Sequence, residues 1–127
     1  MESILIEGTA KTPSIKFEPA SGKLEIKGRS IPEDSIGFYA NLMISLDEFV
    51  NKVTVPAEVS VQLEYFNTAS SKCIFEVLKR FEAIHVKGGK ASVNWQFEED
   101  DDDMRETGED YKSLLTLPFN IQEIAPE

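Results

Sequence analysis

The sequence predicts a two-layer α/β domain, in which helices cover mainly one face of a mixed sheet of about four to five strands. Two observations lead to this prediction. Apolar and polar residues alternate in every strand candidate, as expected for strands with one buried face and one wet face. Amphipathic helix candidates separate these strands, whereas a sheet buried between helices would carry continuous apolar runs. The length of 127 residues fits one domain over residues 1–127.

The strand candidates are four alternating segments. Residues 14–18 and 23–27 lie on either side of Ser21-Gly22, a pair typical of a hairpin turn, so they should pair antiparallel. Residues 59–65 and 91–97 lie on either side of a helix candidate. Because a strand, a helix and a strand in succession form a crossover unit, these two strands should be parallel, with a right-handed connection.

Two longer helices are predicted. The first runs from Asp34 to Lys52, with an apolar stripe along one side. Before it, Ser30-Ile31-Pro32-Glu33 combines capping-box spacing with a proline, both typical of a helix entrance. The second helix runs from Ala69 to Lys87, and Gly88-Gly89 ends it.

The C-terminal part of the chain has a weaker pattern. We expect a short acidic helix from Asp102 to Thr107, which Gly108 ends. The segment Leu114–Ile124 should dock as a short helix followed by an extended closing segment.

The charge distribution excludes several classes of partner. The net charge is −10, and residues 98–110 contain nine acids and one base, Arg105, so they carry −8 and the rest of the chain −2. Negative charge of this size repels phosphate backbones and anionic lipid, so we expect neither nucleic acid nor membrane as a partner. No apolar run approaches the roughly 18 residues of a membrane span, and the N-terminus lacks a basic lead. The single cysteine, Cys73, suits a reducing compartment, so we expect a cytoplasmic protein.

No set of residues predicts an enzyme, a metal site or a cofactor. His85 is the single histidine and lies late in the second helix, where it suits the negative end of the dipole. Cys73 is either a small core residue or a thiol favoured as thiolate by the helix start. The run Asp100–Asp103 lacks the alternating ligands and the glycine of a calcium loop. It is either a solvated acidic helix start or a docking patch for a basic partner.

The most informative motif is Tyr65-Phe66-Asn67-Thr68-Ala69-Ser70-Ser71-Lys72, where a central strand ends and the second helix begins. Its polar residues can simply cap the helix. A functional interpretation starts from the same position, because ligand and partner sites gather at the carboxyl ends of the strands of open sheets. A phosphate added to a hydroxyl there would meet unpaired N–H groups, the positive end of the helix dipole and Lys72.

This arrangement resembles the STAS domain of anti-sigma-factor antagonists, where a serine or threonine in this place is phosphorylated to disrupt partner binding. The sequence more closely resembles the SiaC family of bacterial regulatory phosphoproteins, over nearly the whole chain. The segments that carry this resemblance are Gly8-Thr9, Thr12-Pro13-Ser14-Ile15, Gly28-Arg29-Ser30-Ile31-Pro32-Glu33-Asp34, Tyr65-Phe66-Asn67-Thr68-Ala69-Ser70-Ser71-Lys72, Val93-Asn94-Trp95, Asp101-Asp102-Asp103-Met104, Gly108-Glu109-Asp110-Tyr111 and Leu117-Pro118-Phe119.

The resemblance implies a non-enzymatic protein that is phosphorylated on Thr68, with a partner kinase that adds the phosphate and a metal-dependent phosphatase that removes it. The unphosphorylated form is expected to bind an effector, in at least some systems a diguanylate cyclase linked to biofilm formation. Ala69 departs from the family motif, where serine is common. The expected partner-binding residues are Tyr65, Asn67, Thr68, Ser70, Ser71 and Lys72, together with Pro32, Glu33 and Asp34 at the same end of the sheet.

Two other functions stay open at this point. One is an adaptor that works without phosphorylation, through the acidic face around Asp100–Asp103. The other is an enzyme or small-ligand receptor in the crevice at the strand ends, which the absence of a general base near Thr68 disfavours.

Overall fold

A six-stranded mixed sheet and three helices make up the part of the chain that the structure, a computed structural model, describes (residues 1–125). The strands are β1 (Ile4–Ile6), β2 (Ser14–Glu18), β3 (Lys23–Ser30), β4 (Ala57–Phe66), β5 (Ala91–Glu98) and β6 (Phe119–Ile124). The helices are α1 (Ser35–Lys52), α2 (Thr68–Val86) and α3 (Asp102–Leu114).

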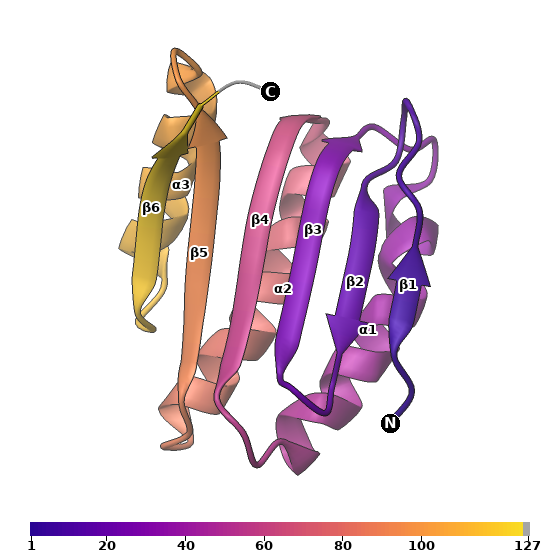
Figure 1. The fold of residues 1–127 in the computed structure, drawn as a ribbon, viewed down its shortest axis with the longest axis vertical. Helices are drawn as coiled ribbons and strands as arrows, with labels where there is room; N and C mark the ends of the chain where they lie inside the picture. The colour runs from indigo at the N-terminus through magenta and orange to yellow at the C-terminus, as the bar shows by residue number, and fades with distance from the viewer. Residues whose placement is uncertain (126–127) are drawn as a thin grey trace.

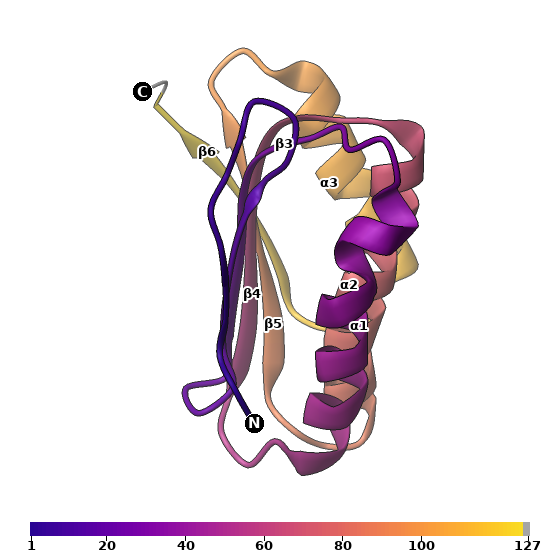
Figure 2. The same cartoon turned by 90° about the vertical axis from the view of Figure 1, so that its right-hand side faces the viewer.

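The order of the strands in the sheet is the order of the chain, from β1 at one edge to β6 at the other. The first three strands pair antiparallel, and β3, β4, β5 and β6 pair in parallel, with one helix in each parallel connection. Because each crossover moves one place in the same direction with the same hand, all three helices fall on one face of the sheet. Figures 1 and 2 show this arrangement, with the sheet on one side and the helices on the other.

The alternation in the strands separates the core from the wet face, as predicted. In β5, Val93, Trp95 and Phe97 point toward the helices and are buried. On the opposite face, the Nδ2 of Asn120 in β6 donates a hydrogen bond of 3.0 Å to the Oδ1 of Asn94. The predicted one-sided α/β sheet is confirmed, with six strands in place of the expected four to five.

The additional strand is β1, which the alternating pattern did not predict. It is three residues long and pairs antiparallel with β2 at the edge of the sheet. Its central residue, Leu5, is 75% exposed, while Ile4 and Ile6 pack against the core. All three residues are apolar, so the segment shows no alternation in the sequence. None of the helices within residues 1–125 has the length and apolar character needed to span a membrane.

The start of α1 differs from the sequence prediction. Asp34 is the N-cap, and its Oδ1 accepts a hydrogen bond of 3.0 Å from the backbone N–H of Gly37. The expected capping box at Ser30-Ile31-Pro32-Glu33 is wrong, because Ser30 is the last residue of β3 and its side chain is fully buried.

The third helix is longer than predicted, because Gly108 lies inside it. The helix continues to Leu114, and the expected short helix in the tail is replaced by a short irregular connection and the parallel strand β6. Gly108 lies against Trp95, whose Nε1 donates a hydrogen bond of 2.9 Å to the carbonyl oxygen of Met104. A Cβ atom at position 108 would overlap Cδ1 of Trp95 and lie 2.7 Å from its Nε1. The glycine is therefore required for close packing between α3 and β5.

We predict that Gly108→Ala lowers the free energy of unfolding by about 1–3 kcal/mol, the usual cost of overpacking a buried site. Without a clash, replacing glycine by alanine in a helix interior would stabilise the protein by roughly 1 kcal/mol. A loss of stability would therefore indicate the clash with Trp95. Urea unfolding measures it. Lys112→Ala, at an exposed position of the same helix, is the control and should change stability by less than about 0.5 kcal/mol. A Gly108→Ala protein as stable as the wild type would contradict this packing.

Candidate functional site

The parallel strands place the predicted site residues at one end of the sheet, where the carboxyl ends of the central strands lie. Strands β3 and β4 end there, and α1 and α2 begin there (Figure 1). The backbone N–H of Asn67 donates a hydrogen bond of 3.0 Å to the carbonyl oxygen of Ser30, and its side-chain Nδ2 lies 3.4 Å from the carbonyl oxygen of Pro32. The segment Pro32–Asp34 therefore lies beside the start of α2, as the sequence predicted.

Thr68 is the first residue of α2, and its side chain is exposed. Asn67 is the N-cap, and its Oδ1 accepts a hydrogen bond of 2.8 Å from the backbone N–H of Ser70. The first backbone N–H bonded to a carbonyl of this turn is that of Ser71, at 2.9 Å from the oxygen of Asn67. Within residues 1–125, the N–H groups of Thr68 and Ala69 and the hydroxyl of Thr68 make no hydrogen bond. The hydroxyl is therefore accessible at a positively polarised helix end.

The neighbouring serines are in different environments from Thr68. Ser70 is fully buried, so the expectation that its side chain contributes to an exposed partner surface does not hold in this structure. Ser71 is half-buried, and its Oγ donates a hydrogen bond of 2.7 Å to the carbonyl oxygen of Thr68. Of the serine and threonine residues in the motif, Thr68 alone has a free and exposed hydroxyl group.

A buried hydroxyl cluster lies beneath Thr68. The Oγ of Ser30 lies 2.7 Å from the hydroxyl of Tyr39 and 2.8 Å from the Oγ of Ser70. The Oγ of Ser35 lies 3.1 Å from the Oγ of Ser70 and 3.4 Å from the Oδ1 of Asn67. These hydrogen bonds join β3, α1 and α2, and their burial from water makes them stronger.

Sequence reasoning missed Ser30, Ser35 and Tyr39 as part of the site. One available signal was the position of Ser30 on the inward side of its strand, in phase with Leu24 and Ile26. A hydroxyl group there must find a buried partner, because an unpaired buried polar group is costly. Among the described residues, every buried side-chain nitrogen and oxygen has such a partner.

An open hollow of about 610 Å³ lies next to Thr68, between α2 and the start of α3. On one side it is lined by Tyr65, which is 55% exposed, and on the other by Asp101 and Asp103. Asp101 is the N-cap of α3, with its Oδ1 3.1 Å from the backbone N–H of Met104. The acidic segment and Thr68 are far apart in the sequence, but in the structure they share one surface.

Two further contacts hold α3 against α2 at this surface. The hydroxyl of Tyr111 donates a hydrogen bond of 2.9 Å to the carbonyl oxygen of Ser71. The rings of Tyr111 and Phe75 lie 5.3 Å apart between centroids. The exposed Lys72 makes no ion pair within the described residues, so its ammonium group is available near Thr68.

The remaining candidates for chemistry have structural roles. Cys73 is buried, and its pKa is raised by that burial and by the charges of Asp34 and Glu76, so the thiolate is disfavoured. His85 lies half-buried in the last turn of α2. Within residues 1–125, no group of three or more histidine, cysteine, aspartate or glutamate side chains could hold a metal ion.

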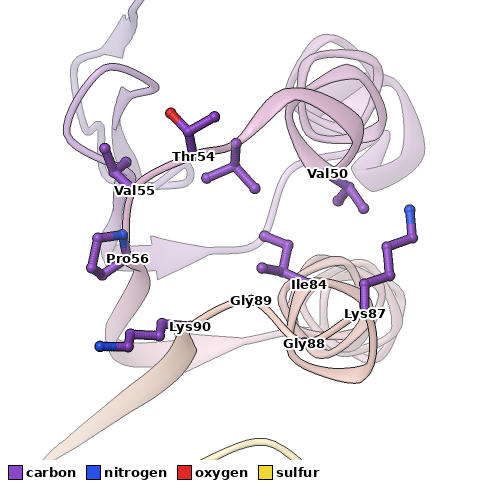
Figure 3. A pocket seen from close by; sticks show the side chains of 10 residues that line it. Val50, Thr54, Val55, Pro56, Ile84, Lys87, Gly88, Gly89 and Lys90 are labelled. Atoms are coloured by element: carbon purple, nitrogen blue, oxygen red, sulfur yellow. The ribbon is translucent and has the colours of Figure 1, made fainter.

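A second hollow, of about 620 Å³, lies at the opposite end of the sheet, between the ends of α1 and α2 and the starts of β4 and β5. Figure 3 shows Val50 and Ile84 beside it, with the ammonium groups of Lys87 and Lys90 pointing in different directions. The Nζ of Lys87 is bonded to the Oδ1 of Asn51 at 3.1 Å. Because its polar groups do not converge, this hollow has no arrangement suited to a charged ligand.

We predict that Asn67→Ala lowers the free energy of unfolding by about 1–2 kcal/mol, because it removes the cap of α2 and the acceptor for Ser35. Asn67→Asp keeps the accepting oxygen and loses only the donor to Pro32, so it should cost less. Urea unfolding compares the two variants. Equal losses for both would show that the cap is not the main contribution of this side chain.

A second prediction concerns Tyr39, whose pKa is raised to about 12 by burial. The phenol titrates near pH 10 in the unfolded chain, so between about pH 10 and 12 only the unfolded state releases the proton. The stability of the wild type should therefore fall in this window by up to about 1.4 kcal/mol per pH unit, relative to Tyr39→Phe. Near pH 8 the wild type should be more stable by about 1 kcal/mol, from the hydrogen bond to Ser30. Urea unfolding of both proteins at pH 8 and pH 11 tests this, and a constant difference between them would contradict it.

Comparison with known proteins identifies the group to which this arrangement belongs. The profile described as SiaC family regulatory phosphoprotein matches residues 6–124. Among curated proteins, an uncharacterized protein of Pseudomonas aeruginosa strain UCBPP-PA14 is 29% identical over 122 residues, which cover 96% of this chain and 97% of that protein.

Solved structures agree with this match. The structure of apo-SiaC from Pseudomonas aeruginosa superimposes with a TM-score of 0.86 at 29% identity, covering 96% of this chain and 99% of that one. SiaC in the structure of the diguanylate cyclase SiaD in complex with its activator SiaC, from the same organism, gives a TM-score of 0.90 at 28% identity, covering 95% and 99%. The resemblance seen in the sequence is confirmed, and the chain belongs to the SiaC family of regulatory phosphoproteins.

Proposed function

We propose that this chain is a phosphorylation switch, in which the state of Thr68 decides whether an effector protein binds. The observation that carries the proposal is the free, exposed hydroxyl of Thr68 on the first residue of α2, beside unpaired N–H groups. These N–H groups and the helix dipole favour an added phosphate, so the fold tolerates the modification. No catalytic activity of the chain itself is part of this proposal.

The proposed effector is a diguanylate cyclase, bound by the unphosphorylated form. Support comes from the related SiaC of Pseudomonas aeruginosa, which is described as the activator of the diguanylate cyclase SiaD in their complex. A protein kinase would add the phosphate to Thr68, and a metal-dependent phosphatase would remove it. We further propose that these reactions occur in the cytoplasm, where a reduced Cys73 would persist.

The mechanism we propose is electrostatic. Phosphate on Thr68 adds a charge of about −1.5 to −2 to a surface that already carries Asp101 and Asp103 in the adjoining hollow. Lys72 is a cation close to the same turn of α2. An effector surface shaped for a neutral hydroxyl would have to bury the phosphate with too few counter-charges, at a cost of several kcal/mol.

We predict that Thr68→Ala binds the effector as well as the unphosphorylated wild type, while Thr68→Glu binds at least 100-fold more weakly, about 2.7 kcal/mol. The measurement is a titration of the purified chain against the diguanylate cyclase of its source organism. Thr54→Glu, an exposed position at the opposite end of the sheet, adds the same charge and should bind normally.

A second candidate function uses the same surface without phosphorylation. The acidic side chains in the hollow favour it, because they could bind a basic partner directly. In that case Thr68→Glu would bind like Thr68→Ala, and Asp103→Asn would weaken binding. These two results together would favour a constitutive adaptor over the phosphorylation switch.

A further inference from the structure

The exposed side of α1 carries a row of apolar side chains. Ile36 is 77% exposed and Ile44 is 67% exposed, and the exposed Ala40 lies between them. These residues are spaced four apart, so their side chains form one ridge of about 12 Å along the helix. Leaving two large aliphatic side chains in water on one ridge has no benefit for the isolated fold.

The contacts between α1 and α2 place the start of this ridge at the level of the first turn of α2, which contains Thr68. The two helices run in the same direction, with both N-termini at the same end of the sheet (Figure 1). Asp47 of α1 bonds Arg80 of α2 at 3.1 Å, which shows which side of α1 faces α2. Ile36 precedes Asp47 by 11 residues, about three turns, so it lies on the same side.

The residue pairs in contact between α1 and α2 show which turn of α2 lies at the level of Ile36. Asp47 meets Arg80, 33 positions later in the chain, and Ser35 meets Ser70, 35 positions later. The same offsets place Ile36 level with Ala69–Ser71, in the first turn of α2. The apolar ridge therefore begins at the level of the helix turn that carries the phosphorylation site that we propose, and it extends away from that end of the sheet along α1.

Other exposed aliphatic residues are single. Val86 is 71% exposed at the last residue of α2, and Leu114 is 67% exposed at the end of α3. Single exposed apolar side chains are normal on protein surfaces. These two positions serve as matched controls for Ile36 and Ile44.

We propose that the ridge Ile36–Ala40–Ile44 is a docking surface for an amphipathic helix of the effector, a helix whose apolar face is bordered by lysine or arginine. This inference rests on the function proposed above. Side chains four apart on one helix form the ridges that pack into the grooves of a second helix. A convex helix surface offers no concave site for a small ligand.

Charge selects the partner. Glu33 and Asp34 are exposed at one end of the ridge, and Glu48, which pairs with Lys52 at 2.7 Å, lies one turn beyond Ile44 at the other. These carboxylates, on a chain with a net charge of −10, attract basic residues beside the partner's apolar face. A second copy of the chain would bring the same carboxylates together, and like charges disfavour that contact.

Photo-crosslinking in cells of the source organism tests the proposal. Benzoylphenylalanine is placed at position 36 or 44, and at position 86 or 114 as control, in the full chain carrying Thr68→Ala. Mass spectrometry of the product identifies the cross-linked peptide. We expect cross-links from 36 and 44, and none from 86 and 114, to one peptide with apolar residues at helical spacing flanked by lysine or arginine. The same probes in a Thr68→Glu chain should lose at least 90% of this product.

Binding measurements with the purified effector extend this test. Ile36→Gln and Ile44→Gln replace an aliphatic side chain by a polar one without loss of helix propensity, and together they should weaken binding at least tenfold. Val86→Gln and Leu114→Gln should change it less than twofold. Circular dichroism and urea unfolding confirm that each variant is folded.

The outcomes separate the surface from the switch. Cross-links to a second copy of this chain, cross-links from the control positions, or none from 36 and 44 would each overturn the docking surface. If Thr68→Glu removes binding while the glutamine variants at 36 and 44 bind normally, the switch stands and the ridge is not used. If the ridge cross-links equally in the Thr68→Ala and Thr68→Glu chains, the surface stands and the switch is overturned.

Discussion

The position of Thr68 depends on one side chain, the carboxamide of Asn67. Its oxygen accepts from the backbone of Ser70 and from the hydroxyl of Ser35, and its nitrogen lies within reach of the carbonyl of Pro32. A single planar group thus holds the end of β4, the start of α2 and the segment before α1 in fixed relation. Because the following residue is Thr68, the direction of its side chain follows from this arrangement, and aspartate or serine could reproduce only part of it.

Local patterns in the sequence predict most of the fold. Alternation in Val93, Trp95 and Phe97, and the helical stripe of α1, depend on neighbours within two to four positions, so a single sequence reveals them. The fit of Gly108 against Trp95 depends on two elements that meet only in three dimensions. In a sequence taken alone, a glycine after a helical segment usually indicates the end of the helix. The full length of α3 could therefore not be inferred from local sequence patterns.

The candidate site divides along the same line. Thr68 was predicted to lie at an exposed helix start, because a strand end, a hydroxyl group and a helix start are adjacent in the chain. The burial of Ser70 was also accessible from the sequence, since it lies four residues before Ile74 and seven before Val77, on the inward stripe of α2. By contrast, the placement of Asp101 and Asp103 beside Thr68 requires knowing how α3 crosses the sheet, and the sequence alone does not specify that crossing.

The burial of the hydroxyl cluster bears on how a phosphate at Thr68 could act. Ser30, Tyr39 and Ser70 are shielded from water, and Ser30 is hydrogen-bonded to both of the others, so a charge added on the exposed side of the same turn would not contact an unpaired buried group. The unpaired N–H groups of the first turn would stabilise that charge in place. A phosphate that changes neither the fold nor the buried cluster would change only the surface that a partner contacts. The effect of phosphorylation should therefore lie in the affinity for the effector, with the fold of the chain unchanged in both states.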